Sequence, residues 1–204
     1  MIEIFLRGGP VMWPLLVTSV ITLAVIVERL IFVIKETRKR NAESIIQTLE
    51  RVERGDLDGA TRIAEATQDF VSRILAYGLR HHGESLTNAI SNAANRELKR
   101  FSRGLSVLDT AITLAPLLGL LGTVTGLIRS FRFMGNQELT SPVAITGGIA
   151  EALVATAFGL SIAIIALIPF NYLNARLEEA RHEIEDSTTQ LELLLRHFQR
   201  SAKE

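Results

Sequence analysis

The sequence predicts an all-α membrane protein with three transmembrane helices, a cytoplasmic helical-hairpin domain and a C-terminal amphipathic helix. The chain has 204 residues, with 22 Lys and Arg against 22 Asp and Glu, but these charges are unevenly distributed. A single charged residue, Glu151, lies within three stretches, 10–27, 110–128 and 139–175. Uncharged apolar runs of about 18 residues can cross a bilayer, whereas exposed helices of a soluble domain carry charges throughout. The composition therefore excludes an ordinary soluble enzyme, and we expect no enzymatic activity.

Apolar runs, helix stops and charge clusters divide the chain into seven predicted segments. They are an external segment 1–9, a first transmembrane helix 10–34, a cytoplasmic helical domain 35–104, a second transmembrane helix 105–131, an external loop 132–140, a third transmembrane helix 141–174 and a cytoplasmic C-terminal helix 175–204. Lys and Arg concentrate in the helical domain and the tail, and the positive-inside rule places both in the cytoplasm.

The first apolar run is expected to be a retained span and not a cleaved signal peptide. Only Arg7 precedes it as a basic residue, and a basic cluster follows it at positions 35–40, as after a stop-transfer segment. Glu28 and Arg29 lie near its inner end. Because charges are costly in lipid, both side chains should face protein or reach the interface.

Residues 35–104 are predicted to form four short helices in antiparallel hairpins, because apolar residues recur there at helical spacing. Gly55 supplies a stop after the first helix, and Ser85 is a suitable N-cap for the fourth. The adjacent His81 and His82 have no further ligand at useful spacing, so we interpret them as residues at a helix end. The chain has no cysteine, and we expect neither a metal nor a cofactor.

The third span is predicted to begin at Ser141-Pro142, an N-cap followed by proline at the first helical position. It is longer than a bilayer needs, so the helix should project beyond the membrane. Apolar and small residues then alternate spacings of three and four, at Leu177, Ala180, Ile184, Ser187, Leu191, Leu194 and Phe198. Three heptads are marginal for a coiled coil, so this stripe needs a partner in the same chain or in another subunit.

Small residues at helix-packing spacing are concentrated in the second and third spans. Membrane helices use such faces to bring their backbones close together. The residues that we assign to helix packing are Pro116, Gly119, Gly122, Gly126, Gly148, Ala152, Ala155 and Gly159.

Polar residues are set among these small residues, at Thr110, Thr113, Thr123, Thr125, Glu151 and Thr156. A membrane threonine commonly donates its hydroxyl to the carbonyl one turn back. Glu151 lies about 15 Å along the axis from the start of the third span. A carboxylate there should face a cavity, a partner or water, or be protonated, unless the helix protrudes and Glu151 lies near the outer headgroups. The uncharged stretches hold no second charge, so this chain alone offers no complete proton relay.

The block Ala115–Gly126 resembles the second-span signature of the ExbB/TolQ/MotA proton-channel family, and Gly148–Leu160 resembles the third-span signature. The pairs Glu28-Arg29 and Gly55-Asp56, and one span before the cytoplasmic block, are typical of the ExbB/TolQ branch. The sequence departs from the family in its third span, where Ile164-Ile165 replaces a usual Ile-Pro and a proline follows only at 169.

This resemblance implies a subunit of a bacterial inner-membrane motor driven by the proton-motive force. Family members form a homopentamer around the single spans of two ExbD/TolR-like subunits, whose membrane aspartate carries the proton. The assembly energises a TonB- or TolA-like protein for outer-membrane transport or envelope maintenance. The positions that match the family's polar pore lining are Thr123 and Thr156, with Glu151 as an accessory residue. The N-terminus would then be periplasmic and the C-terminus cytoplasmic.

Two other classes of function remain open from the residues themselves. One is a self-sufficient cation channel, in which rings of Glu151 would supply the charged lining. The other is a structural membrane scaffold whose polar residues only pack. Nucleic acid is not an expected partner, because the net charge is zero and no basic aromatic cluster occurs.

Overall fold

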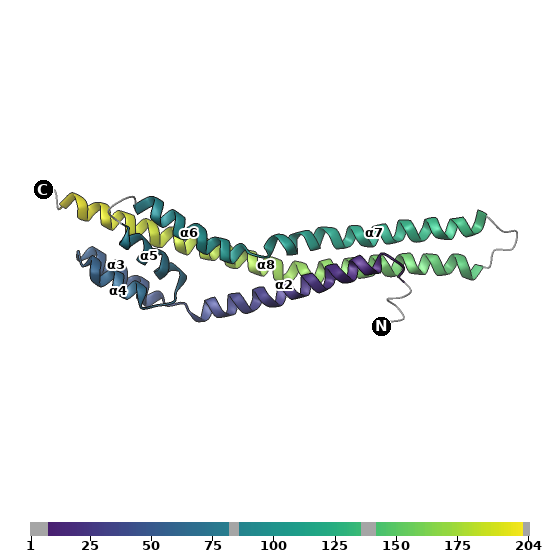
Figure 1. Ribbon diagram of the computed structural model, residues 1–204, viewed down its shortest axis with the longest axis horizontal. Helices are drawn as coiled ribbons and strands as arrows, with labels where there is room; N and C mark the ends of the chain where they lie inside the picture. Colours follow the sequence, from purple (N-terminus) through teal and green to yellow (C-terminus); the bar gives the residue numbers. More distant parts are fainter. Residues whose placement is uncertain (1–7, 82–85, 136–141, 202–204) are drawn as a thin grey trace. The chain divides into compact units, whose positions relative to one another are not determined.

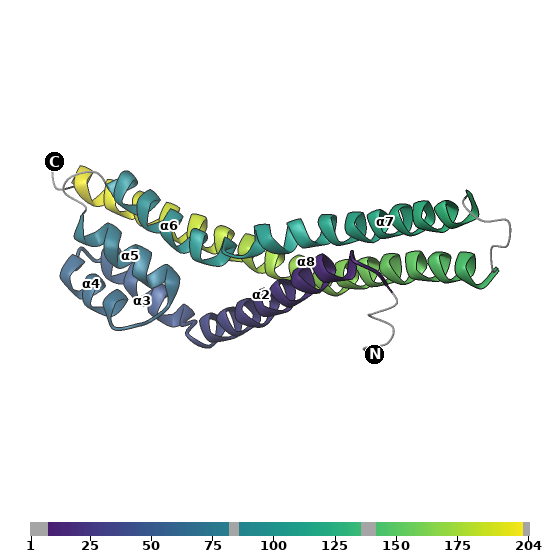
Figure 2. The same ribbon diagram turned by 45° about the vertical axis from the view of Figure 1, so that its right-hand side comes forward.

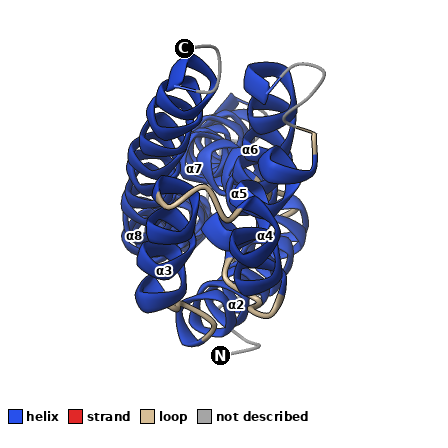
Figure 3. Ribbon diagram, turned by 90° about the vertical axis from the view of Figure 1, so that its left-hand side faces the viewer, coloured by secondary structure: helices blue, strands red, loops and turns tan. Residues whose placement is uncertain are grey.

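The computed structural model describes residues 8–81, 86–135 and 142–201, and these residues are helical, without strands (Figures 1 and 3). The helices are α2 (Met12–Arg38), α3 (Ala42–Glu53), α4 (Leu57–Glu65), α5 (Phe70–Arg80), α6 (Leu86–Ser102), α7 (Leu105–Gly135) and α8 (Pro142–Ser201). Three helical stretches are long and apolar enough to cross a membrane: Met12–Arg38, Leu86–Arg132 and Thr146–His197. The predicted class, an all-α membrane protein, is confirmed. The predicted caps Ser85 and Ser141, like His82, lie outside the described residues.

The chain divides into two compact units, and α2 and α8 contribute to both. The first unit comprises Met1–Arg29 and Gly104–Tyr172, and the second comprises Leu30–Arg103 and Leu173–Glu204. We call them the transmembrane unit and the helical unit. The transmembrane unit contains α2 as far as Arg29, all of α7 and the first half of α8.

The transmembrane unit has a small core and an apolar exterior. Its core brings Met12 and Leu15 of α2 against small and apolar residues of α7 and α8: Ala115, Ala155 and Ile162. Large apolar side chains point outward, among them Leu117, 61 % exposed, and Ile168, 71 % exposed. Extensive exposed apolar surface is unfavourable in water but suits contact with lipid. In Figures 1 and 2, α7 and the first half of α8 run side by side.

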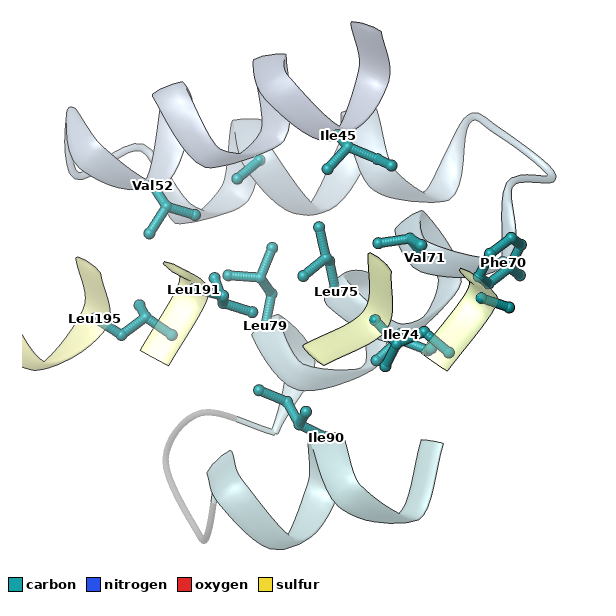
Figure 4. Close-up of a cluster of buried hydrophobic side chains, with 13 residues drawn as sticks. Ile45, Val52, Phe70, Val71, Ile74, Leu75, Leu79, Ile90, Leu191 and Leu195 are labelled. Atoms are coloured by element: carbon teal, nitrogen blue, oxygen red, sulfur yellow. The ribbon is translucent and has the colours of Figure 1, made fainter. Parts of the chain in front are cut away.

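The helical unit has the larger core, built around α5. Figure 4 shows Leu75 and Leu79 of α5 between Val52 of α3, Ile90 of α6 and Leu191 of α8. Local signals fix the short helices that supply these residues. Their N-caps are Asn41, Asp56 and Asp69, whose side-chain oxygens accept backbone N–H groups of the first turns. Gly55 ends α3 with a positive φ of 79°, as expected for a helix stop.

The apolar stripe beyond the third span is covered within the chain. Ala180, Ile184 and Leu191 are 3 %, 2 % and 0 % exposed and belong to the core of the helical unit. Leu195 is also buried, whereas Leu194, the predicted member, is only partly buried. The side chain of Phe198 lies outside the described residues. The seam therefore needs no second subunit, and it no longer supports oligomerisation.

Asp69 is the most connected buried charge of the helical unit. Its carboxylate is fully buried and accepts the N–H groups of Val71 and Ser72 in the first turn of α5. It also accepts the N–H group of Asn41 at 2.9 Å and pairs with Arg40 Nη1 at 2.7 Å. One side chain thus caps α5 and fixes the segment that joins α2 to α3.

A second network ties the end of α2 to α5 and α6. Arg73 Nη2 lies 2.8 Å from Glu36 Oε1 and 3.0 Å from Glu97 Oε2. Desolvation lowers the pKa of the Arg73 guanidinium, but the hydrogen bonds to Glu97 and Glu36 raise it more, so the pKa lies above its ordinary value. Burial raises the pKa of the Glu183 carboxyl, although the charge of Arg40 opposes the shift.

We predict that Asp69→Ala destabilises the helical unit by about 2–4 kcal/mol, because it removes a helix cap and one member of a largely buried ion pair. Hydrogen–deuterium exchange of the α5 amides in the purified full-length protein measures the effect. The matched control is Asp58→Ala, since Asp58 is exposed in the first turn of α4. Unchanged exchange in α5 for Asp69→Ala would show that the cap is dispensable.

Candidate functional site

The backbones of α7 and α8 come together along their small residues. A Cβ atom at Gly119 would lie 3.0 Å from the Ala155 carbonyl oxygen, and one at Gly122 would lie 2.5 Å from Ala155 Cβ. A Cβ at Gly126 would lie 3.0 Å from Ala152 Cβ. These distances leave no room for a larger residue on α7, so glycine sets the separation of the two helices.

The same contact continues toward both ends of the pair. A Cβ at Gly159 would overlap the carbonyl oxygen of Ala115, the residue before Pro116. Pro116 itself lies within α7, where its ring removes a backbone donor from the helix. At the other end, a Cβ at Gly148 would overlap the Ser130 hydroxyl, which donates to the Gly126 carbonyl at 3.1 Å. All the residues assigned to helix packing thus lie on these two helices, and most lie at their contact.

Thr156 bonds across this contact. Its hydroxyl donates to the Gly119 carbonyl of α7 at 3.0 Å. The Thr123 hydroxyl instead donates to Leu120 of its own helix at 2.6 Å. Thr110, Thr113 and Thr125 likewise donate to carbonyls of α7. The two threonines that the sequence motifs predicted to line a pore, Thr123 and Thr156, therefore differ in what holds them.

Glu151 forms an ion pair with a residue of α7. Its Oε1 atom lies 2.8 Å from Nη1 of Arg129, and the two side chains are 21 % and 43 % exposed. A Cβ at Gly9, which has a φ of +72°, would overlap the Glu151 carboxylate, so the backbone before α2 also reaches this pair. The carboxylate therefore lies where the start of α2, α7 and α8 meet.

Arg129 was not predicted as a partner of Glu151, because it lies just outside the uncharged stretches. Arg129 lies one residue beyond the second stretch but inside the predicted span 105–131. The sequence did contain a signal for this ion pair: one short loop joins the two spans, and they carry opposite charges. Glu151 is thus not an isolated carboxylate that must face a cavity or be protonated.

The hydroxyl geometry sets what the threonines can do chemically. A hydroxyl has one donor and two acceptor lone pairs. In both Thr123 and Thr156 the donor is already used by a backbone carbonyl. Each oxygen can therefore still accept a hydrogen bond, from water or from a protonated acid, but cannot donate one without breaking its bond. Among the described residues, no cluster of His, Cys, Asp or Glu has the arrangement of a metal site.

Paired membrane helices with polar hydroxyls between small residues define a multi-pass membrane protein with a buried polar contact. Comparison with known proteins identifies the class: residues 66–186 match the model of the MotA/TolQ/ExbB proton channel family. The chain belongs to this family, which confirms the resemblance in its span motifs. It is a family of channels and not of enzymes.

Similar proteins extend the match beyond this region. A putative biopolymer transport protein, ExbB-like 1, of Synechocystis is 35% identical over 96% of this chain and 79% of its own length. The ExbB-like 3 protein of the same organism is 34% identical over 95% of this chain and 94% of its own. The Tol-Pal system protein TolQ of Pseudomonas aeruginosa is 39% identical over 47% of this chain and 41% of its own.

We predict that Gly159→Ala forces α7 and α8 apart and costs about 1–3 kcal/mol, because the new methyl group overlaps a backbone carbonyl and not a movable side chain. The thermal unfolding midpoint of the full-length protein in detergent should fall. The control is Gly147→Ala on the same helix, where a Cβ would meet no atom within 4 Å. That variant should be neutral or more stable by about 0.5–1 kcal/mol. Equal midpoints for the two variants would contradict the close contact.

Proposed function

We propose that this chain is the ExbB/TolQ-like subunit of an inner-membrane motor driven by the proton-motive force. In this role it acts with an ExbD/TolR-like partner to energise a TonB- or TolA-type protein. The observation that carries the proposal is the family match over residues 66–186, which includes the polar positions of both α7 and α8. The similarity to biopolymer transport proteins over nearly the whole chain supports the same branch.

The proposed chemistry places the moving proton on the partner. Thr123 and Thr156 would line the path, and their free lone pairs would accept a hydrogen bond from water or from the partner's protonated aspartic acid. A proton that crosses the membrane releases about 2.3 kcal/mol per 100 mV. This energy is comparable to the hydrogen bonds that must be exchanged along such a path. The hydroxyls would therefore guide the proton without holding it.

Glu151 would have an accessory role at the external end of the path. Its ion pair with Arg129 supports this view, because the guanidinium already occupies the carboxylate. The pair also weakens the alternative of a self-sufficient cation channel. Rings of Glu151 would be accompanied by equal numbers of Arg129, and the two charges would cancel.

The proposed assembly is a homopentamer around the partner's single spans. Neither the small residues of α7 and α8 nor the stripe on α8 supports it, since both are covered within one chain. What supports it is the family match, together with apolar residues that α7 leaves exposed, such as Leu120 and Val124. We place the N-terminus in the periplasm and the helical unit in the cytoplasm, following the distribution of Lys and Arg.

We predict that Thr123→Val lowers motor activity about tenfold while assembly survives. Valine keeps the volume but removes the hydrogen bond that the hydroxyl oxygen would accept from water or from the protonated acid, worth up to about 1.5 kcal/mol. Thr156→Val should have the same effect and should also destabilise the α7–α8 contact by about 1 kcal/mol. Co-purification of the ExbD/TolR-like partner measures assembly, and activity dependent on the proton-motive force measures function.

Two further variants sharpen this experiment. Thr125→Val is the matched control. The Thr125 hydroxyl also bonds its own helix, but a separation of two residues puts Thr125 on a different face of α7 from Thr123. It should work normally. Glu151→Gln should be milder than either pore variant, since an amide keeps most of the hydrogen-bonding capacity. Full activity in both Thr123→Val and Thr156→Val would refute the pore lining, and a loss only in Glu151→Gln would move the proton site onto this chain.

We predict that a cysteine at position 137 is labelled from outside intact spheroplasts by a membrane-impermeant maleimide, whereas a cysteine at position 62 is not. The chain has no native cysteine, so each variant carries one label site. Permeabilised cells provide the control and should label both positions. Labelling at position 62 but not at 137 in intact spheroplasts would reverse the proposed topology.

A further inference from the structure

The basic residues of the helical unit fall into two groups. Most arginines have an acidic partner, as Arg40, Arg73 and Arg80 do. A second group is exposed and forms no ion pair with any described residue: Lys35, Arg38, Lys39, Arg96, Lys99 and Arg103. We call these six residues the juxtamembrane cations. Arg62 on α4 is a further exposed cation without such a pair.

The juxtamembrane cations occur at the polar ends of two membrane spans. Residues 35–39 directly follow the apolar run of α2, and Arg103 lies two residues before the start of α7. The two sets are also adjacent in space, because α2 packs on α6 there. The Phe32 and Phe101 rings lie edge to face with centroids 5.4 Å apart, and Arg100 Nη2 lies 3.8 Å from Glu36 Oε2.

The nearest acidic residues cannot neutralise this cluster. Glu36 is buried at the α2–α6 contact and is bound by Arg73 and Arg100. Glu97 is bound by the same two arginines. Both carboxylates are thus already bound by Arg73 and Arg100. The outward-facing cations are left without a counter-charge among the described residues.

Helix dipoles alone do not account for the arrangement. Cations favour the last turn of a helix, which explains Lys35 and Arg38 in α2 and Lys99 in α6. Lys39 and Arg103 lie beyond the helix ends, and Arg96 lies before the last turn. Orientation by the positive-inside rule requires basic residues near the spans, but it does not require them to be exposed, unpaired and gathered on adjacent helices.

We propose that the juxtamembrane cations form a binding surface for the headgroups of anionic phospholipids in the leaflet next to the helical unit. Clusters of four to eight basic residues beside a span attract anionic lipid. The exposed Ile31 and Ile34 lie directly before Lys35, so acyl chains can lie on apolar surface while the phosphate meets the cations. This apolar surface continues into a membrane span, which favours a lipid over an acidic protein or nucleic acid. The binding surface needs only a bilayer and is independent of proton transport.

Native mass spectrometry of the full-length protein in detergent, titrated with phosphatidylglycerol or phosphatidylcholine, tests the surface. We expect the wild type to bind phosphatidylglycerol more tightly than phosphatidylcholine. Its affinity for phosphatidylglycerol should fall as the NaCl concentration rises. The variants K35Q/R38Q/K39Q and R96Q/K99Q/R103Q should each lose affinity about tenfold or more. The matched control R54Q/R62Q/R80Q removes the same number of charges from the C-cap of α3, from α4 and from α5, and it should bind like the wild type.

Several outcomes would overturn the proposal. If both juxtamembrane variants bind phosphatidylglycerol as tightly as the wild type, or if the control variant loses as much affinity as they do, no local binding surface exists. Full displacement of the lipid by inorganic phosphate would indicate a general anion site. Unchanged lipid binding together with loss of assembly would assign the cations to acidic residues of another chain. If the variants do not fold, photocrosslinking of phosphatidylglycerol to the wild type decides, since labelled peptides must include residues 35–39 and 96–103.

Discussion

The close approach of α7 and α8 is the constraint on which the transmembrane unit depends. Lipid supplies no hydrophobic drive that brings apolar helices together, so van der Waals contact and interhelical hydrogen bonds must hold the pair. Glycines at 119, 122 and 159 remove the side chains that would separate the backbones. The short separation in turn lets the Thr156 hydroxyl reach the Gly119 carbonyl. The same glycines therefore set both the helix packing and the position of the Thr156 hydroxyl, so a change in the packing also moves the hydroxyl.

Charges follow a different rule in the helical unit. Its buried carboxylates are all bound: Asp69 by a helix N-terminus and Arg40, and Glu36 by Arg73 and Arg100. An unpaired charge in such a position would be strongly destabilising. The juxtamembrane cations, which have no ion-pair partner among the described residues, are instead exposed, at or near the ends of α2 and α6 that adjoin the spans. This division gives the paired charges a structural role and leaves the unpaired ones for the membrane surface.

Local patterns predicted most of the fold. The uncharged runs identified the three apolar helices, and Gly55 together with helical spacing of apolar residues identified the short helices. Each of these signals is contained within one stretch of the sequence, so no tertiary partner is needed to recognise it. Tertiary partners were beyond such signals. The stripe on α8 was visible, but its cover by α3, α5 and α6 was not, and an unbroken α-helix places Leu195 inward where a heptad predicted Leu194. Arg129 and Glu151 are 22 residues apart on different helices, and periodicity does not give their relative rotation.

The state of the polar groups bears on which subunit would carry the proton. Thr123 and Thr156 have spent their donors on backbone carbonyls, and Glu151 has a guanidinium partner. The hydroxyls can accept a hydrogen bond but cannot release a proton at accessible cost, and the carboxylate is bound by Arg129. Hydroxyls and a paired carboxylate of this kind can stabilise a protonated acid that visits them. We therefore propose that the titrating group enters with the partner's span, and that this chain provides the fixed acceptors past which it moves.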